Sequence, residues 1–336
     1  MSFTPSISVL LPYFNAELTL KRAIDSILHQ QFHDVELILV DNNSSDSSAR
    51  IAHEAAKLDH RVVLANEARQ GVVFASETGA KMARGKYISR MDADDVAHSG
   101  KLLKQKIYLD EHPNCGAIAS QVCYVPHKKN TDGFARFVEW SNSICSYEEI
   151  LHGRFIEMPV VNPTLMWRKE IQAKHGLYRS GGFPEDYEMI LRWLHEGVRI
   201  EKIPEVLFDW HDSSNRLTRT DNIYSDASFY RVKSTYLALC LKKINPFHPE
   251  VSIWGASRIS RRRARDLEKL GIRFQQFIDI KKNRQIAANI LHYKDLPSAG
   301  KLFVLSYIRH SDKREKVREF LLERGYKEGV DFLMVS

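Results

Sequence analysis

The sequence lacks long apolar runs and has few cysteines. No stretch approaches the roughly 18 apolar residues of a membrane-spanning helix, and residues 1–5 lack the basic and apolar segments of a secretory signal. The four cysteines form neither a C-x-x-C pair nor a Cys/His spacing typical of zinc sites. These absences argue against a membrane-spanning protein and a cysteine zinc site, and they predict a cytoplasmic protein with reduced thiols.

A net positive charge is absent from most of the chain and is found only near its end. Of 336 residues, 43% are hydrophobic and 27% charged, as in soluble proteins of one large or two ordinary domains. Residues 249–336 hold 19 Lys and Arg against 11 Asp and Glu, whereas the rest holds 30 against 31. The basic part is either a solvated surface or a contact for an acidic partner, such as the inner face of a membrane. No nucleic acid partner is expected.

Strand and helix patterns alternate through the first part of the chain. Short apolar runs predict strands over 7–11, 35–40, 61–65 and 87–89, with helical periodicity between them. This alternation predicts an α/β fold with a parallel, doubly wound sheet, in which ligands bind beyond the carboxyl ends of the strands. Pro12, Asp41 and Asp92 each follow such a strand end, so we expect them to share one crevice.

The stretch from Arg90 to Asp95 holds three carboxylates within four residues. Like charges this close repel one another, which favours a cation between them. Because residues i and i+2 of an extended chain point the same way, Asp92 and Asp94 can face one divalent ion. The alternative is a solvated acidic turn that caps the next helix, and Asp95 is expected to have that capping role.

Several blocks of sequence resemble family 2 glycosyltransferases. They are Ser8–Ala16 (SVLLPYFNA), Ile38–Ser44 (ILVDNNS), Ala83–Asp95 (ARGKYISRMDADD), Asn162-Pro163, and Gly182–Glu188 (GFPEDYE) with Arg192-Trp193. The likeness covers about residues 6–220 and implies the nucleotide-sugar-binding fold called GT-A. One departure is Ser76-Glu77, where the family often has Arg-Asn or Leu-Asn, so no ligand contact is assigned to this helix.

The resemblance also implies site residues. It places Pro12, Tyr13, Asp41, Asp92 and Ala93 at the nucleotide, and Asp92, Asp94 and His211 at a Mn or Mg ion. A divalent cation would stabilise the negative charge that develops on a departing nucleoside diphosphate. An ordinary surface histidine is the alternative for His211. Arg216, in the loop that follows, is a candidate phosphate contact.

Asp186 resembles the family's general base. It would take the proton from the acceptor hydroxyl as that oxygen attacks the anomeric carbon, which implies inversion. The alternative is purely structural, because acidic residues stabilise a helix N-terminus, and Glu185-Asp186 opens a helical pattern.

Two domains are expected, a GT-A domain over 1–244 and a small Rossmann-like domain over 250–336, joined by a linker at 245–249. The linker has two prolines in four residues, and the β/α pattern restarts after it. A dinucleotide site would have G-x-G-x-x-G, whereas this chain has Gly255-x-Ser257-x-x-Ser260. A structural, docking or dimerising role is therefore expected, although Asp279 stands where a ribose-binding acid could be.

The sequence thus predicts a metal-dependent, inverting glycosyltransferase. The donor would be a nucleotide sugar, UDP-linked, and the acceptor a hydroxyl of a glycan or glycolipid in bacterial surface polysaccharide synthesis. Two alternatives stay open: a non-catalytic nucleotide-sugar-binding protein, and an NAD(P)-linked oxidoreductase acting through the C-terminal module.

Overall fold

The computed structural model describes residues 4–127, 132–213, 216–281 and 289–336. Residues 1–3, 128–131, 214–215 and 282–288 lie outside this range. The chain forms two compact units, one of Met1–Ile150 with Pro159–Ser225 and the other of Leu151–Met158 with Asp226–Ser336. None of the helices in the described part of the chain has the length and apolarity needed to cross a membrane.

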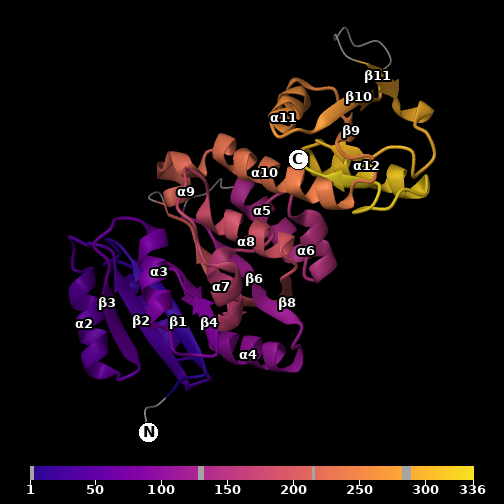
Figure 1. Cartoon of the computed structure of the whole chain (residues 1–336). Helices are drawn as coiled ribbons and strands as arrows, with labels where there is room; N and C mark the ends of the chain where they lie inside the picture. The colour runs from indigo at the N-terminus through magenta and orange to yellow at the C-terminus, as the bar shows by residue number, and fades with distance from the viewer. Residues whose placement is uncertain (1–3, 128–131, 214–215, 282–288) are drawn as a thin grey trace. The chain divides into compact units, whose positions relative to one another are not determined.

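An eight-stranded sheet forms the centre of the first unit, in the order β3-β2-β1-β4-β7-β6-β8-β5 (Figure 1). Strands β1 to β4 pair in parallel, as do β6 and β8, whereas β7 and β5 pair antiparallel with their neighbours. The strands are β1 (Ile7–Tyr13), β2 (Val35–Asp41), β3 (Val62–Asn66), β4 (Tyr87–Arg90), β5 (Val96–Ala97), β6 (Cys115–Val125), β7 (Met166–Arg168) and β8 (Arg199–His211).

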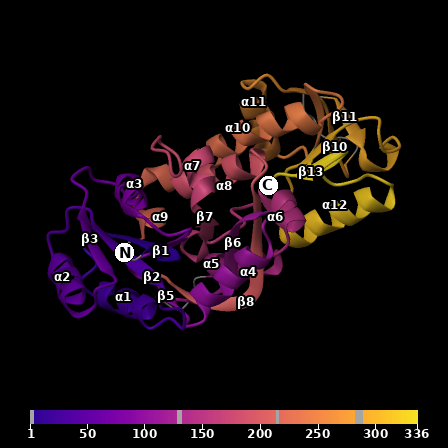
Figure 2. The ribbon, with the colours of Figure 1, turned by 60° about the horizontal axis from the view of Figure 1, so that its bottom comes forward.

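Helices cover both faces of the parallel part of this sheet. In Figure 2, α1 and α2 lie on one face and α3 on the other, as right-handed crossovers require when the strand order reverses at β1. Every residue of β1 is buried, since both faces are covered. The helices are α1 (Leu20–Leu28), α2 (Ser48–Leu58), α3 (Val72–Met82), α4 (Lys101–Glu111), α5 (Asp132–Ser143), α6 (Tyr147–Gly153), α7 (Lys169–His175), α8 (Glu185–His195) and α9 (Leu217–Thr220).

Two prolines behave differently from the sequence expectation. Pro12 does not end the first strand but lies inside β1 opposite Val40, so the strand continues to Tyr13. A proline within a strand is typical of a sheet edge, whereas β8, which contains Pro204, lies between β6 and β5. The register between β6 and β8 jumps from Ile203 to Val206, which leaves Pro204 outside the ladder.

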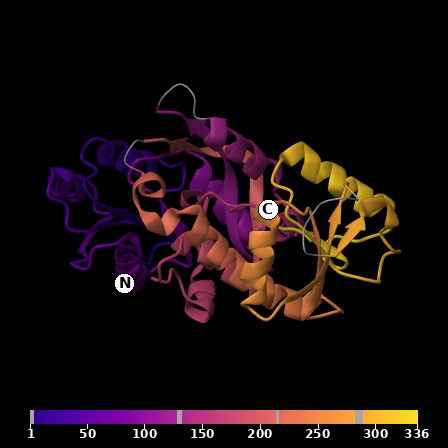
Figure 3. The same cartoon turned by 90° about the horizontal axis from the view of Figure 1, so that it is seen from above.

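The second unit contains a five-stranded parallel sheet, in the order β11-β10-β9-β12-β13. Figures 1 and 3 show α11 and α12 on opposite faces of it. Trp254 of β9 packs edge-on against Phe320 of α12, 5.5 Å between ring centroids. The elements are α10 (Asp226–Ile244), β9 (Glu250–Trp254), α11 (Arg258–Glu268), β10 (Arg273–Asp279), β11 (Ile290–His292), β12 (Val304–Ser306), α12 (Ser311–Glu323) and β13 (Phe332–Met334).

The compact units divide the chain at a different place from the expected linker. The sequence expectation assigned residues 226–244 to the first domain, whereas α10 belongs to the second compact unit. Two contacts show why. The buried ammonium of Lys233 donates to the carbonyl of Ile156 at 2.8 Å, and the Arg263 guanidinium of α11 stacks 3.1 Å from the ring centroid of Tyr230.

Candidate active site

The carboxyl ends of β1, β2 and β4 meet at one edge of the first sheet. Tyr13 lies opposite Asp41 in the β1–β2 ladder, and Leu10 lies opposite Arg90 in the β1–β4 ladder. The loops after β1 and β2 are tied together, because Ser45 N–H donates to Asn15 Oδ1 at 2.8 Å. Pro12, Asp41 and Asp92 therefore do share one edge, as the strand pattern predicts.

The three residues expected at the nucleotide base differ in exposure. Pro12 and Tyr13 are buried, whereas Asp41 is partly exposed and accepts a hydrogen bond from Ser44 N–H at 3.0 Å. Burial, followed by the charges of Asp41 and Asp46, raises the pKa of the Tyr13 phenol above its usual range. Tyr13 and Asp41 therefore interact electrostatically at the carboxyl edge of the sheet.

A buried arginine holds Asp92. Arg90 ends β4 with its side chain almost fully enclosed, and its Nη2 lies 2.7 Å from Asp92 Oδ1. Its Nη1 donates to Ser76 Oγ at 2.7 Å. Ser76 is the position where the sequence departs from the family pattern, and here it supports the arginine that orients Asp92. Ala93, the next residue, packs partly buried against the core.

Asp94, Asp95 and His211 gather beside Arg22 and Arg216. Arg22 Nη2 donates to the main-chain oxygen of Asp94 at 2.7 Å, and Arg216 Nη1 donates to that of His211 at 2.8 Å. Burial and the neighbouring Asp92 raise the pKa of Asp94, although the two arginines oppose this shift.

The expectation that Asp95 caps the next helix is wrong. Asp95 is fully buried, and its Oδ1 accepts the main-chain N–H of His211 at 2.8 Å. Helix α4 starts later, at Lys101, with Gly100 at its N-cap. This hydrogen bond connects the acidic loop to the end of β8. It therefore places His211 near Asp94, the neighbour of Asp95 in that loop.

Two further carboxylates come from the first turn of α8. Glu185 is buried and accepts a hydrogen bond from the Tyr224 hydroxyl at 2.8 Å. Burial and the neighbouring Asp186 raise the pKa of Glu185 to about 8, and burial also raises the pKa of Asp186 to about 6. The charge of Asp92 contributes to the shifts of both Asp94 and Asp186. Asp92 therefore links the acidic loop to α8 within one electrostatic cluster.

The donor set of this cluster suits a hard divalent cation, although it does not form a finished site. Buried Asp95 Oδ2 has no hydrogen-bond partner, and carboxylate oxygen is the ligand type that Mg and Mn prefer. Within residues 4–127, 132–213, 216–281 and 289–336, no three His, Cys, Asp or Glu side chains are arranged to hold a metal ion.

Comparison with known proteins gives the family. The model of glycosyl transferase family 2 matches residues 8–175, half of the chain. The chain belongs to this family. An uncharacterized glycosyltransferase of Haemophilus influenzae is 25% identical over 250 residues, 73% of this chain and 77% of the relative. The minor teichoic acid biosynthesis protein GgaB of Bacillus subtilis is 39% identical over 116 residues, which are 34% of this chain and 13% of GgaB.

Solved structures show the same fold at low sequence identity. Staphylococcus aureus TarS 1–349 in complex with UDP-GlcNAc superposes with a TM-score of 0.57 and 15% identity, covering 78% of this chain and 70% of TarS. The mannosyltransferase PcManGT from Pyrobaculum calidifontis, in complex with GDP-Man and Mn²⁺, gives 0.50 and 17%, covering 72% and 65%. The first unit therefore has the GT-A fold of the family 2 enzymes.

Sequence reasoning found part of the acidic cluster and missed the rest. It singled out Asp92, Asp94, Asp186 and His211, which the structure brings to the same edge of the sheet. It assigned no role to Arg90, although Arg90 lies within the block Ala83–Asp95, nor to Tyr224, which lies outside every block that resembles the family. The signal available for Arg90 was its position, a charged residue at the end of an apolar strand and two residues before Asp92.

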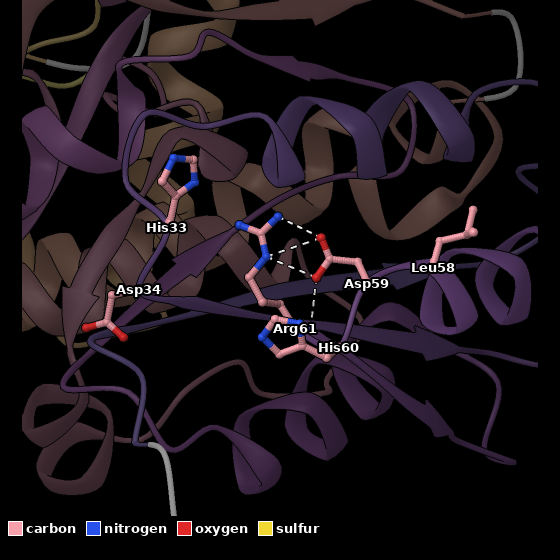
Figure 4. A pocket seen from close by; sticks show the side chains of 6 residues that line it. All are labelled: His33, Asp34, Leu58, Asp59, His60 and Arg61. Atoms are coloured by element: carbon pink, nitrogen blue, oxygen red, sulfur yellow. Dashed lines mark hydrogen bonds and ion pairs between the residues drawn. The ribbon is translucent and has the colours of Figure 1, made fainter.

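A hollow of about 580 Å³ lies at the other end of the strands (Figure 4). His33, Asp34 and Leu58 line it with Asp59, His60 and Arg61. These residues precede β2 and β3, so the hollow opens at the amino ends of the strands, away from the acidic cluster. Arg61 Nη2 lies 2.7 Å from Asp59 Oδ2 and also donates to the Leu28 carbonyl at 2.9 Å, so its donors are bonded within the protein. We assign no ligand to it.

Proposed function

We propose that this protein is an inverting glycosyltransferase that moves a sugar from a UDP-linked donor to a hydroxyl of a glycan or glycolipid acceptor. The observation that carries the proposal is Asp92, whose charge adds to the effect of burial in raising the pKa of both Asp94 and Asp186. Asp94, expected near the donor diphosphate, and Asp186, the candidate base, therefore belong to one cluster. A single-displacement reaction requires both groups at one site. Membership of glycosyl transferase family 2 supports the transfer reaction itself.

Asp186 is the proposed general base. Its carboxylate takes the proton from the acceptor O–H while that oxygen bonds to the anomeric carbon, and the bond from this carbon to the diphosphate oxygen breaks on the opposite face. A pKa near 6 keeps Asp186 ionised at neutral pH and basic enough to accept a proton. Glu185, with its higher pKa, stays protonated there and spares Asp186 a second negative neighbour.

The donor is proposed to bind along the loops after β1, β2 and β4. Pro12, Tyr13 and Asp41 would contact the base, and Asp92 and Ala93 the ribose and its surroundings. Asp92, Asp94 and His211 would hold Mn or Mg, which when bound neutralises charge on the departing diphosphate. The unpartnered Asp95 oxygen and the raised pKa of Asp94 support a cation here, because both reflect negative charge that nothing in the cluster fully balances.

The pathway and location are inferred from relatives and charge. GgaB supports a role in bacterial surface polymer synthesis. Such acceptors are carried by lipids, so we place the protein in the cytoplasm, in peripheral contact with the inner face of the membrane through its basic last quarter.

The second unit is proposed to be a Rossmann-like docking or dimerising module, and the domain boundary of 244/250 stays a prediction. An NAD(P)-linked oxidoreductase is the weaker alternative. Ala256 N–H already donates to Asp279 Oδ2 at 3.0 Å, and Ser260 N–H to Ser257 Oγ at 3.1 Å, so two donors that a pyrophosphate would need are bonded within the chain.

A thermal-shift panel tests this function. Nucleotide sugars are added with and without Mn²⁺, and selective, Mn²⁺-dependent stabilisation by one UDP-sugar is expected, because ligands that bind only the native state stabilise it. Release of free sugar from that donor then separates an enzyme from a non-catalytic nucleotide-sugar-binding protein. Absence of stabilisation by every nucleotide sugar, together with stabilisation by NADH, would replace the proposal with the oxidoreductase alternative.

A further inference from the structure

Of the two helices that cover the sheet of the second unit, α11 is the basic one. Between Arg258 and Lys269 the chain has six basic and two acidic residues, whereas α12, on the opposite face of the same sheet, has four of each (Figures 1 and 3). Residues 258–269 therefore carry a net charge of +4, half of the net +8 of residues 249–336, whereas α12 carries no net charge.

The cations of α11 form one continuous stripe. Arg258, Arg262, Arg265 and Lys269 recur at spacings of four, three and four, which places them on the same side of the helix, and all four are exposed. In the described part of the chain, no carboxylate forms an ion pair with Arg258, Arg262 or Arg265; Lys269 has a long contact of 3.4 Å to Asp266. Three charges of the stripe are thus not neutralised by the protein.

Apolar side chains flank this stripe. Ile259, in the first turn, is 54% exposed, and Leu270, just past the last turn, is 44% exposed. At 100° per residue the two positions face nearly the same direction beside the cations, one near each end of the helix. Opposite the stripe, Ala264 and Leu267 are buried toward the sheet, so the helix is fixed in this orientation.

We propose that this face of α11 binds the surface of an anionic lipid bilayer, with the four cations at the phosphate headgroups and Ile259 and Leu270 entering the interface. A nucleic acid would use the same cations but would not favour two exposed aliphatic side chains beside them, and an acidic protein is tested below with polyglutamate. Helices that lie in a membrane interface combine these two features. This inference locates the membrane contact of the proposed function, and it holds or fails independently of the transfer chemistry.

Vesicle sedimentation with the full chain tests the proposal. Vesicles of phosphatidylglycerol mixed with phosphatidylcholine are compared with vesicles of phosphatidylcholine alone. Each basic residue near an anionic surface is worth roughly fivefold in partitioning, so Arg262→Glu with Arg265→Glu should weaken binding to the anionic vesicles at least about 25-fold. The matched control, Lys313→Glu with Lys316→Glu on α12, changes the net charge equally and should leave most of the binding intact.

Two further measurements make the test decisive. Ile259→Ser should weaken the binding that persists in high salt, where the headgroup attraction is screened. UDP binding with Mn²⁺ should be the same in the α11 variant and the wild type, so that loss of the membrane contact is not confused with loss of the active site. Equal effects of the α11 and α12 variants would overturn the proposal. So would binding to duplex DNA or polyglutamate as tight as to the anionic vesicles.

Discussion

The first four strands of each sheet are arranged in the same order, but the residues at the carboxyl ends of these strands differ between the two sheets. In both, the first strand lies between the second and the fourth, which opens a crevice where the crossovers diverge. In the first sheet this edge gathers Asp41, Asp92 and Asp94. In the second sheet Gly255, with φ of +97°, lies against Ile308, since a Cβ added there would come within 3.0 Å of Ile308 Cδ1.

The difference shows that strand order alone does not make a ligand site. Buried carboxylates with raised pKa values indicate an edge whose charge is unbalanced, and such clusters concentrate at functional sites. At the second edge, Asp279 accepts a hydrogen bond from the chain's own Ala256 N–H. The first edge is therefore where we propose that a cation and a nucleotide bind, whereas at the second edge Asp279 is already bonded within the chain.

Among the substitutions that test this difference between the two edges, the largest loss of glycosyl transfer is expected at Asp186. Asp186→Asn keeps the shape of the side chain but cannot accept the acceptor proton, so transfer should fall by about 10²–10⁴-fold. Binding of UDP with Mn²⁺, measured by calorimetry, should change little. Turnover close to that of the wild type would show that Asp186 is not the general base. Its carboxylate would then only stabilise the N-terminus of α8.

The next effect is expected for Asp94. Asp94→Ala should weaken UDP binding in the presence of Mn²⁺ by at least about tenfold and leave the weak binding without Mn²⁺ almost unchanged. Asp279→Asn at the second edge is the matched control, since it retains an acceptor for Ala256 N–H. If Asp279→Asn weakened UDP binding as much as Asp94→Ala, the two edges would not differ in the way described.

A smaller effect, visible as a shift in pH dependence, is expected for Arg90. The Arg90 guanidinium lowers the pKa of Asp186 against the effect of burial. The base works only when deprotonated, so activity should fall below about pH 6 in the wild type, and Arg90→Gln should move this acid limb to higher pH. Transfer should also fall about tenfold, because Asp92 loses its orienting partner.

The control for Arg90 separates charge from geometry. Arg90→Lys keeps a positive charge but cannot pair with Asp92 and Ser76 at the same time, so the acid limb should stay while transfer falls. An identical acid limb in wild type and Arg90→Gln would show that Arg90 acts only on structure.

The smallest effect is expected at Gly255 and concerns stability alone. Gly255→Ala places a side chain at positive φ against Ile308 and should cost about 1–3 kcal/mol in the unfolding of the second unit. Gly300→Ala has a similar φ of +75° with nothing within 4 Å, so comparison of the two isolates the contact with Ile308. UDP binding should be unchanged in both, and a loss in Gly255→Ala would assign a ligand to the second edge.

The sequence allowed much of the first unit to be predicted, for physical reasons. Strands such as β1 and β2 are buried on both faces and appear as continuous apolar runs, and loops at their carboxyl ends carry the polar residues. Strand β7 and the two-residue β5 were not predicted, because short antiparallel strands take their identity from their neighbours. The assignment of α10 could not be predicted either, since Lys233 and Tyr230 find their partners far along the chain.

By itself, the sequence determined the α/β alternation, the family and the acids that follow β2 and β4, because each depends on residues close together in the chain. Only the tertiary structure decided which groups surround those acids. Ser76 of α3 meets Arg90, His211 of β8 meets Asp95, and Tyr224 meets Glu185, across separations of 14 to 116 residues. Burial at these meeting points raises the pKa of the carboxylates, and burial is a property of the packed fold rather than of any single motif.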